Sequence, residues 1–414
     1  MKKILIVPLL LSSSLLWAVD WPSWLGPEGT GVSTESSWKN NLEEQAWKTK
    51  VGVGFSTVSV AEGRLYTMGH DGRKSGGNET VYCLDAKTGK VIWTHAYPAP
   101  LLDYLHEGGP CSTPTVDGST VYALSKHGIL HAYGAKDGKI LWKKEMMKEA
   151  GMRRPPEWGF AASPYLLGDL LLIEAGATFA LDKKTGETKW KSQAYRAAYG
   201  SPTSFNSGKS DLIAVLKTDG LVILDAANGK TLAFEKWETS YRTNATTPIV
   251  RKDKIFISTG YKRGCALFRY NTGKLTKVYE NRNLSTHMNN AIPVGDFLYG
   301  FDGNVHMAGP KDFVCLKFST GEVQWRQKDA GLMVGSLIVA DDRIIALGQR
   351  GELAIAHANP KKFSSIAREQ VIGGRCWTPP VLANGLLYLR NARGDLICLD
   401  LRTCLLYTSP SPRD

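Results

Sequence analysis

The sequence has few of the features on which common membrane and catalytic classes depend. Beyond its first eighteen residues it has no run of about 20 apolar residues, the length that crosses a bilayer as a helix. It has no Gly-rich phosphate loop, no His/Cys spacing of a zinc site and no Gly-x-Ser-x-Gly nucleophile turn. Its seven cysteines include no adjacent pair. These absences argue against a membrane-spanning mature chain and against three widespread kinds of active site.

The N-terminus has the pattern of a secretory signal peptide over residues 1–18. Lys2 and Lys3 give it a basic start, the apolar run that follows is short, and the small residue Ala18 ends it. No cysteine lies near the expected cleavage point, so we expect no lipid anchor and a soluble periplasmic or secreted protein. Removing the two lysines lowers the formal net charge from +12 to +10, which still favours anionic envelope partners. The remaining basic residues are scattered, and export also argues against nucleic acid as a partner.

One pattern, VYCLDAKTGKVIW at residues 81–93, returns along the chain. It is typical of a strand, a turn whose glycine takes positive φ, and a second strand. Its clear copies place the turn glycine at positions 89, 138, 186, 229, 273 and 321, with spacings of 49, 48, 43, 44 and 48 residues. Each unit begins with a further strand signal, such as residues 112–124. A period of this length with four short strands per unit predicts the blades of a β-propeller.

Counting the degenerate copies near residues 353–362 and 396–403 gives eight units. The sequence therefore predicts an all-β, eight-bladed β-propeller of four-stranded antiparallel blades over residues 46–403. A four-stranded blade is apolar on both faces and is stable only when neighbours cover them. We interpret the tryptophan that ends the motif, at positions 93, 142, 190 and 325, as a side chain packed between adjacent blades.

The two ends of the chain predict how the ring closes. The eighth unit stops at Thr403, before the strand that would carry the motif tryptophan, whereas residues 45–50 contain a Trp-Lys step without a hairpin partner. We expect residues 45–50 to complete blade eight as its outer strand, antiparallel to residues 395–401. Residues 19–45 are predicted to be an irregular extension that packs on the outside of the ring through Trp21, Trp24 or Trp38.

The last eleven residues, 404–414, break the repeat where the turn glycine is due. Their sequence, CLLYTSPSPRD, resembles the translation of a sequencing adapter, so we interpret them as a non-native tail. Of the six remaining cysteines, Cys83, Cys315 and Cys398 occupy the same position of their repeats, where other copies carry Ala, Ile or Leu. We expect them to be small buried side chains in separate blades and mostly free thiols.

The motif resembles the repeat of the pyrroloquinoline-quinone-like (PQQ-like) β-propeller family. Its Asp, Thr-Gly and Trp appear here as Asp85, Thr88, Gly89 and Trp93, and again at residues 182–190. The segment WPSWLGPEGTGVS at residues 21–33 is similar to the start of secreted bacterial members. The resemblance implies a propeller fold and two alternative functions, because the superfamily includes both scaffolds and quinone-dependent dehydrogenases.

Candidate ligand-binding residues lie in the connectors that lead into the innermost strand of each blade, since these surround the central funnel. Arginine binds carboxylates, asparagine offers a donor and an acceptor, and tryptophan offers a flat face, so this set suits a small anionic or cyclic ligand. The alternative is a merely solvated funnel. The single histidines elsewhere, His306 among them, are interpreted as surface or core residues. The candidates are His106, Glu107, Trp158, Arg242, Asn244, His287, Asn289, Arg375 and Trp377.

Two functions remain open at this point. The first is a non-catalytic scaffold of the cell envelope, expected to be a monomer that binds an envelope protein or polymer at the funnel face. In repeat type it resembles the propeller subunit of the outer-membrane β-barrel assembly machinery, without that subunit's lipid-anchor cysteine. The second is a PQQ-dependent dehydrogenase of alcohols or sugars with calcium, for which Glu107 with Asn244 or Asn289 would supply part of the metal site. That class stacks its quinone beside a vicinal disulfide, which this sequence lacks, so we favour the scaffold and assign no catalytic or metal-binding residue.

Overall fold

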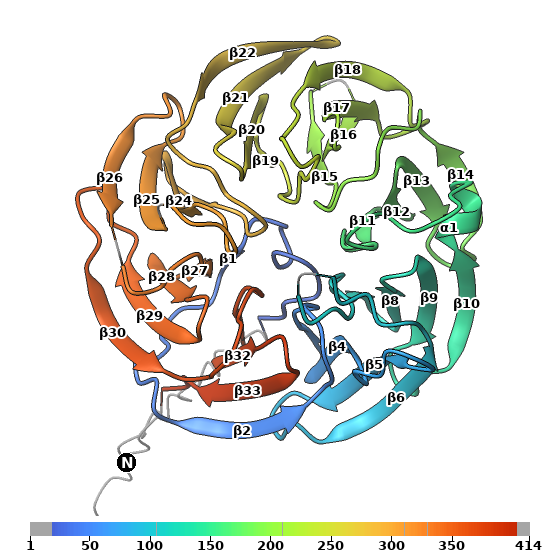
Figure 1. Ribbon diagram of the computed structural model, residues 1–414, viewed down its shortest axis with the longest axis horizontal. Coiled ribbons are helices and arrows are strands. Elements are labelled where there is room, and N and C mark those ends of the chain that lie inside the picture. Colours follow the sequence, from blue (N-terminus) through green and yellow to red (C-terminus); the bar gives the residue numbers. More distant parts are fainter. Residues whose placement is uncertain (1–18, 105, 209, 310, 329, 404–414) are drawn as a thin grey trace, which may run out of the picture.

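The repeat units form eight sheets arranged as a closed ring around a central axis (Figure 1). The computed structural model describes residues 19–104, 106–208, 210–309, 311–328 and 330–403. The expected signal peptide and the expected non-native tail lie outside these ranges. Each sheet is a blade whose strands follow one another from the axis to the rim, and neighbouring strands of the repeat are antiparallel. The prediction of an eight-bladed all-β propeller is confirmed.

Blades 1 to 4 follow the chain in order and contain the only helix of the described residues, a single short turn between blades 2 and 3. Their elements are β3 (Ser59–Ala61), β4 (Arg64–His70), β5 (Asn78–Asp85) and β6 (Val91–Pro98); β7 (Thr115–Asp117), β8 (Thr120–Leu124), β9 (Ile129–Gly134) and β10 (Ile140–Glu145); α1 (Met146–Glu149); β11 (Tyr165–Leu167), β12 (Leu170–Ala175), β13 (Ala177–Asp182) and β14 (Thr188–Lys191); and β15 (Thr203–Asn206), β16 (Asp211–Leu216), β17 (Gly220–Asp225) and β18 (Thr231–Lys236). No helix within the described ranges is long or apolar enough to cross a membrane.

Blades 5 to 8 complete the ring, and the last two each recruit a strand from the N-terminal part of the chain. Their elements are β19 (Ile249–Arg251), β20 (Lys254–Thr259), β21 (Gly264–Asn271) and β22 (Lys274–Asn281); β23 (Ile292–Val294), β24 (Phe297–Asp302), β25 (Asp312–Lys317) and β26 (Val323–Gln327); β27 (Ser336–Ala340), β28 (Arg343–Leu347), β29 (Glu352–His357) and β30 (Ser365–Gln370) with β1 (Val32–Ser33); and β31 (Val381–Ala383), β32 (Leu386–Arg390) and β33 (Asp395–Asp400) with β2 (Gln45–Lys50).

The motif tryptophans pack between blades, as the sequence predicts. Trp93 of blade 1 donates from Nε1 to the Ala135 carbonyl of blade 2 at 3.0 Å. Its ring lies against the turn glycine of that blade, Gly138, where a Cβ would come within 2.6 Å of the indole. Gly138 has φ +71°, so the turn needs glycine both for its backbone angle and for the close approach. The same contact joins Trp142 to Gly186 and Trp190 to Gly229.

The N-terminal strand closes the ring in the predicted way. β2 pairs antiparallel with β33, and Trp47 lies opposite Cys398. Trp47 then makes the motif contact to blade 1, because its Nε1 donates to the Ala86 carbonyl at 3.1 Å and its ring covers Gly89. The fully buried Arg390 of β32 crosses the same seam and donates to the backbone carbonyls of residues 56 and 68. One strand from the start of the chain thus ties the first and last blades together.

The first part of the extension before β2 does not pack on the outside, and the expectation is wrong for Trp21 and Trp24. Trp21 forms a bridge with Val60 of the innermost strand β3, and the Pro22 carbonyl accepts from Val116 of β7. Farther along, β1 pairs in parallel with β27, the innermost strand of blade 7. Figure 1 shows this blue segment crossing the middle of the ring. The cause is geometric, since the inner strands leave an open backbone edge at the axis that an added chain can use.

Candidate functional site

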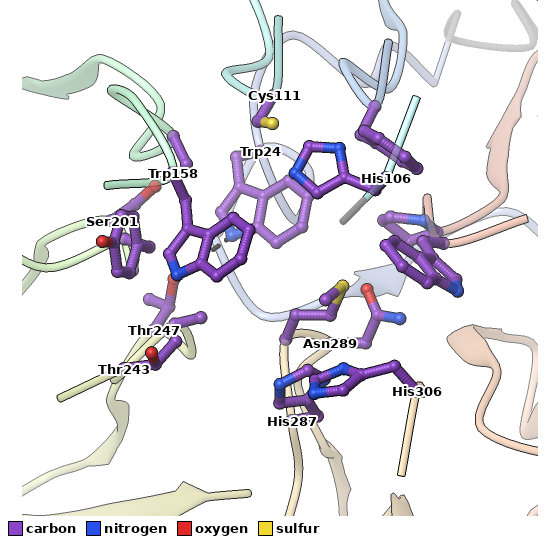
Figure 2. Close-up of a pocket in the computed structure, with 18 of the residues that line it drawn as sticks. Trp24, His106, Cys111, Trp158, Ser201, Thr243, Thr247, His287, Asn289 and His306 are labelled. Atoms are coloured by element: carbon purple, nitrogen blue, oxygen red, sulfur yellow. Dashed lines mark hydrogen bonds between the residues drawn. The ribbon is translucent and has the colours of Figure 1, made fainter. Parts of the chain in front are cut away.

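A chamber of about 370 Å³ lies at the axis of the ring, bounded by the N-terminal extension and by the connectors that enter the innermost strands. Its size is within the usual range for a small-molecule or side-chain pocket. Most of its wall is apolar or aromatic, and no described residue that lines it is acidic. The lining residues used below are Trp24, Phe55, His106, Cys111, Trp158, Tyr261, His287, Asn289, His306 and Trp377 (Figure 2).

The ring brings together five of the nine predicted site residues. They come from distant parts of the sequence. They lie in the connectors that precede the innermost strands of blades 2, 3, 6 and 8, and His287 and Asn289 share one of these connectors. Because all these connectors reach the same mouth of the channel, short polar and aromatic segments become the wall of one site. The five residues that line the chamber are His106, Trp158, His287, Asn289 and Trp377.

Stacked aromatic rings form one side of the chamber. Phe55 lies parallel to Trp377 with 5.2 Å between ring centroids, and the edge of His106 meets Phe55 at the same distance. His106 also lies 5.7 Å from Trp158, whose other contact is the stacked ring of Tyr104. Such flat surfaces provide large apolar contact area at little conformational cost. A ring-bearing ligand or an aromatic side chain would find complementary faces here.

Two histidines and a tyrosine form a second group on the wall. His287 Nε2 lies 3.0 Å from the Tyr261 hydroxyl, and its ring centroid is 5.1 Å from that of His306. Burial, followed by the charges of His306 and Lys311, lowers the pKa of His287 to about 3. Burial likewise lowers the pKa of His306. These imidazoles are therefore neutral at physiological pH and act as polar, uncharged contacts.

His106 is also neutral, for a related reason. Burial lowers its pKa to about 3, and the nearby positive charges of Lys126 and Arg375 add to the effect. A protonated imidazole would be both desolvated and repelled at this place. The chamber wall thus presents uncharged groups, with two cationic side chains lying behind it.

Two of the predicted residues support the wall without lining it. Arg375 Nη1 lies 3.0 Å from Glu107 Oε2, and its guanidinium lies over the Trp377 ring at 4.5 Å from the centroid. The two charges face each other, although Arg375 Nη1 and Glu107 Oε2 are both buried without a hydrogen bond in the described part of the chain. The pair fixes the position of the tryptophan ring that does line the chamber.

The other two predicted residues lie outside the chamber lining. The Asn244 amide is completely buried and donates to the backbone carbonyls of Lys217 and Trp237, at 2.8 and 2.9 Å. It bonds to carbonyls of blade 4, beside the connector that leads into blade 5, which is a structural task. Arg242 is exposed, has φ +52° and is not among the residues that line the chamber. The prediction that both line the funnel mouth is therefore wrong for Asn244, and for Arg242 it stays a prediction.

Several lining residues were missed by sequence reasoning. Trp24 was expected on the outside, yet its Nε1 donates to Thr247 Oγ1 at 3.2 Å and its ring closes the chamber on the side of the extension. His306 was interpreted as a surface or core residue, and Phe55 and Tyr261 carried no signal. A usable signal existed for Phe55, because it lies in the connector before the first inner strand, the position that defined the other candidates.

The residues that line the chamber do not fit a calcium site. Calcium requires six to eight oxygen ligands, usually with several carboxylates. The described lining contains no carboxylate, Glu107 is paired with Arg375, and Asn244 is bonded to backbone carbonyls. Across the described ranges, no group of three His, Cys, Asp or Glu side chains could hold a metal ion. The described lining therefore gives no support to the partial calcium set considered from the sequence.

The fold and the chamber together define a class, an eight-bladed propeller of PQQ-like repeats with one axial binding chamber. A family model described as "Outer membrane protein assembly factor BamB" matches residues 32–157 and 77–327. The chain belongs to this PQQ-like propeller family.

Known relatives agree in sequence and in fold. The outer membrane protein assembly factor BamB of Shewanella oneidensis is 23% identical over 343 residues, which cover 78% of this chain and 78% of the relative. The crystal structure of BamB from Moraxella catarrhalis matches with a TM-score of 0.62 at 18% identity, over 86% of this chain and 99% of that one. A europium-containing methanol dehydrogenase also reaches a TM-score of 0.62, at 11% identity, over 92% and 89% of the two chains. At these identities the structural matches show a shared fold alone.

Proposed function

We propose that this protein is an exported, non-catalytic binding and scaffold protein of the cell envelope. In this proposal residues 1–18 direct export and are removed. The mature propeller then engages a polypeptide of the outer-membrane protein assembly route at the mouth of its channel. The family of the chain and the printed name of its relatives support the assembly class.

The single observation that carries the proposal is the aromatic chamber on the axis. Its neutral wall of stacked rings suits an aromatic or apolar side chain of a partner, and it lacks the carboxylates of a calcium site. Exposed apolar side chains continue the chamber outward, since Tyr104 stacks on Trp158 and Tyr241 lies 4.7 Å from Tyr261. An apolar mouth of this kind on a folded domain favours a binding role.

The test is removal of the gene from its organism and measurement of outer-membrane β-barrel proteins in the isolated membrane. We expect their amounts to fall, to recover with the wild-type gene, and to remain low with a Trp158→Ala, Trp377→Ala double variant that is exported at wild-type amounts. Phe234→Ala, on the outer strand β18, is the matched control and should restore them. Unchanged β-barrel amounts after gene removal would contradict the proposal.

A second assay tests the alternative function, a PQQ-dependent dehydrogenase. Purified protein is mixed with pyrroloquinoline quinone and calcium, and its absorbance and its dye-linked oxidation of alcohols and aldoses are followed. The proposal predicts no change in either signal. Turnover in this assay would replace the scaffold function with an oxidoreductase.

A further inference from the structure

Cys111 differs from the other described cysteines in its surroundings. It lines the chamber and is partly exposed there, on the same side as His106 (Figure 2). The other five described cysteines are buried free thiols. Burial raises the pKa of Cys83 to about 11 and that of each of the other four to about 12. Those five side chains fill space between strands, whereas Cys111 faces a cavity that a ligand can enter.

A buried lysine is directed at the sulfur of Cys111. Lys126 is only 1% exposed, and its Nζ donates to Cys111 Sγ at 3.6 Å. Its stem is held by Gly159, where a Cβ would lie 2.3 Å from Lys126 Cγ. Among the described residues, no carboxylate forms an ion pair with this ammonium group. A buried cation without a counter-charge is costly, and a thiolate at Cys111 would supply that charge.

The nearest acid does not replace the thiolate. Glu79 accepts from the backbone N–H of Lys126 at 3.3 Å and from the Tyr97 hydroxyl at 3.0 Å. Burial raises the pKa of Glu79 to about 7, although the bond from Tyr97, the bond from the Lys126 N–H and the charge of Lys126 oppose that rise. At neutral pH this carboxyl is therefore only partly ionised. Lys126 retains a positive field toward the chamber, which also acts on His106.

The chamber also contains polar atoms that have no partner within the described part of the chain. His287 Nδ1 and Trp377 Nε1 are both buried without a hydrogen bond. Both side chains line the chamber and are at least nine-tenths buried, with 4% and 9% of their surface exposed. Unsatisfied buried donors and acceptors of this kind are uncommon in native proteins, and these two leave hydrogen-bonding capacity in the wall of the chamber. The site around Cys111 is thus a built cavity, in which the cysteine is one of several groups.

We propose that Cys111 is a reactive thiol that forms mixed disulfides with small disulfide compounds entering the chamber, and that Lys126 is the positioning residue that favours its thiolate. The thiolate attacks one sulfur of the incoming disulfide, a new S–S bond forms, and the old S–S bond breaks. The departing sulfur leaves as a thiolate and takes a proton from water. Cys111 is oxidised and the departing thiol is the reduced product. The adduct occupies part of the chamber, so the redox state of Cys111 controls whether another molecule can bind there.

The first test follows the rate of modification at each cysteine. The full chain is treated at pH 7 with the neutral disulfide 4,4′-dithiodipyridine, and the modified peptides are quantified by mass spectrometry, which separates Cys111 from every other cysteine. We expect Cys111 to react at least about tenfold faster than any of the five buried cysteines, and dithiothreitol to reverse the adduct. The same chain in denaturant should show nearly equal rates. A Cys111 rate in the range of the buried cysteines would overturn the proposal.

The second test separates a positioned thiolate from a merely exposed thiol. Lys126→Met keeps the length of the side chain and removes its charge, so Cys111 should react at least about tenfold more slowly at pH 7 and regain its rate only in more alkaline buffer. Lys126→Arg should retain a fast reaction. Lys311→Met is the matched control, because Lys311 Nζ donates to the carbonyls of Asn304 and Val305 instead of the thiol. An unchanged rate in Lys126→Met would contradict the role of the lysine. This experiment does not depend on the proposed assembly partner.

Discussion

Tryptophan is used differently in two regions of this molecule. At a seam between blades, Trp93 has its ring enclosed against a glycine and its Nε1 bonded to the Ala135 carbonyl. In the chamber, Trp377 has one face stacked on Phe55, and its Nε1 is buried without a partner in the described part of the chain. The first arrangement satisfies every group and contributes stability. The second leaves capacity for another molecule, so the comparison separates the residues that hold the ring from those that serve the site.

The largest expected effect comes from removing the strand that closes the ring. A chain without residues 19–50 loses β2, the Trp47 seam and the extension that crosses the channel. We expect its melting temperature to fall much farther than that of a chain without residues 404–414. Equal melting temperatures for the two truncated chains would contradict the shared-blade closure.

A seam tryptophan and a chamber tryptophan should differ strongly in their effect on stability. Trp93→Ala should lower the free energy of unfolding by about 3 to 5 kcal/mol, because it empties a buried aromatic site. Trp158→Ala should lower the free energy of unfolding less, by about 1 kcal/mol, since this side chain is partly exposed and, within the described residues, its Nε1 bonds to no carbonyl across a seam between blades. Denaturant titrations of both variants measure the difference. Similar losses would show that the chamber wall is also a structural seam.

Acid should destabilise the fold, because a histidine of the chamber wall is held neutral in the folded chain. The folded pKa of His287 is about 3, below the ordinary histidine value. The unfolded chain therefore binds more protons between these two values, and stability is lost as the pH falls below about 6.5. Position 287 cannot titrate in the His287→Gln variant. Between pH 6.5 and pH 5 the free energy of unfolding of the wild type should therefore fall by about 1 to 2 kcal/mol more than that of the variant. Parallel stability curves for the two chains would show that His287 is solvated.

The propeller ring could be predicted from the sequence because the residues that define each blade motif are close together in the chain. Asp85 Oδ1 accepts from the N–H and hydroxyl of Thr88 within one turn, and the tryptophan four residues after the glycine reaches the next blade. A corresponding bond joins Asp182 to the Thr185 N–H, and the turn glycine recurs in each clear copy, so period and spacing reveal the repeat. Ring closure was predictable for the same reason, since Trp47 completes the one motif that lacked its last strand.

The chamber was only partly predictable, because its residues meet through the ring and through the orientation of individual side chains. Asn244 and Asn289 lie in corresponding connectors and look alike in sequence. One is fully enclosed by backbone carbonyls, whereas the other reaches the chamber. Trp24 was misplaced because nothing in residues 19–44 indicates that they use the inner edge of the ring. Connector patterns indicate the mouth of the funnel, and they do not determine which side chains turn toward it.

The central claim is that the partner binds at the chamber mouth and not at the outer strands, and site-specific photocrosslinking in cells tests it most directly. A photoreactive phenylalanine replaces Tyr241 at the mouth or Phe234 on the outer strand β18, two aromatic positions that are 60% and 45% exposed. The account predicts crosslinks to an outer-membrane assembly protein from position 241, weakened by Trp377→Ala, and none from position 234. Crosslinks to that protein from position 234 alone would contradict it.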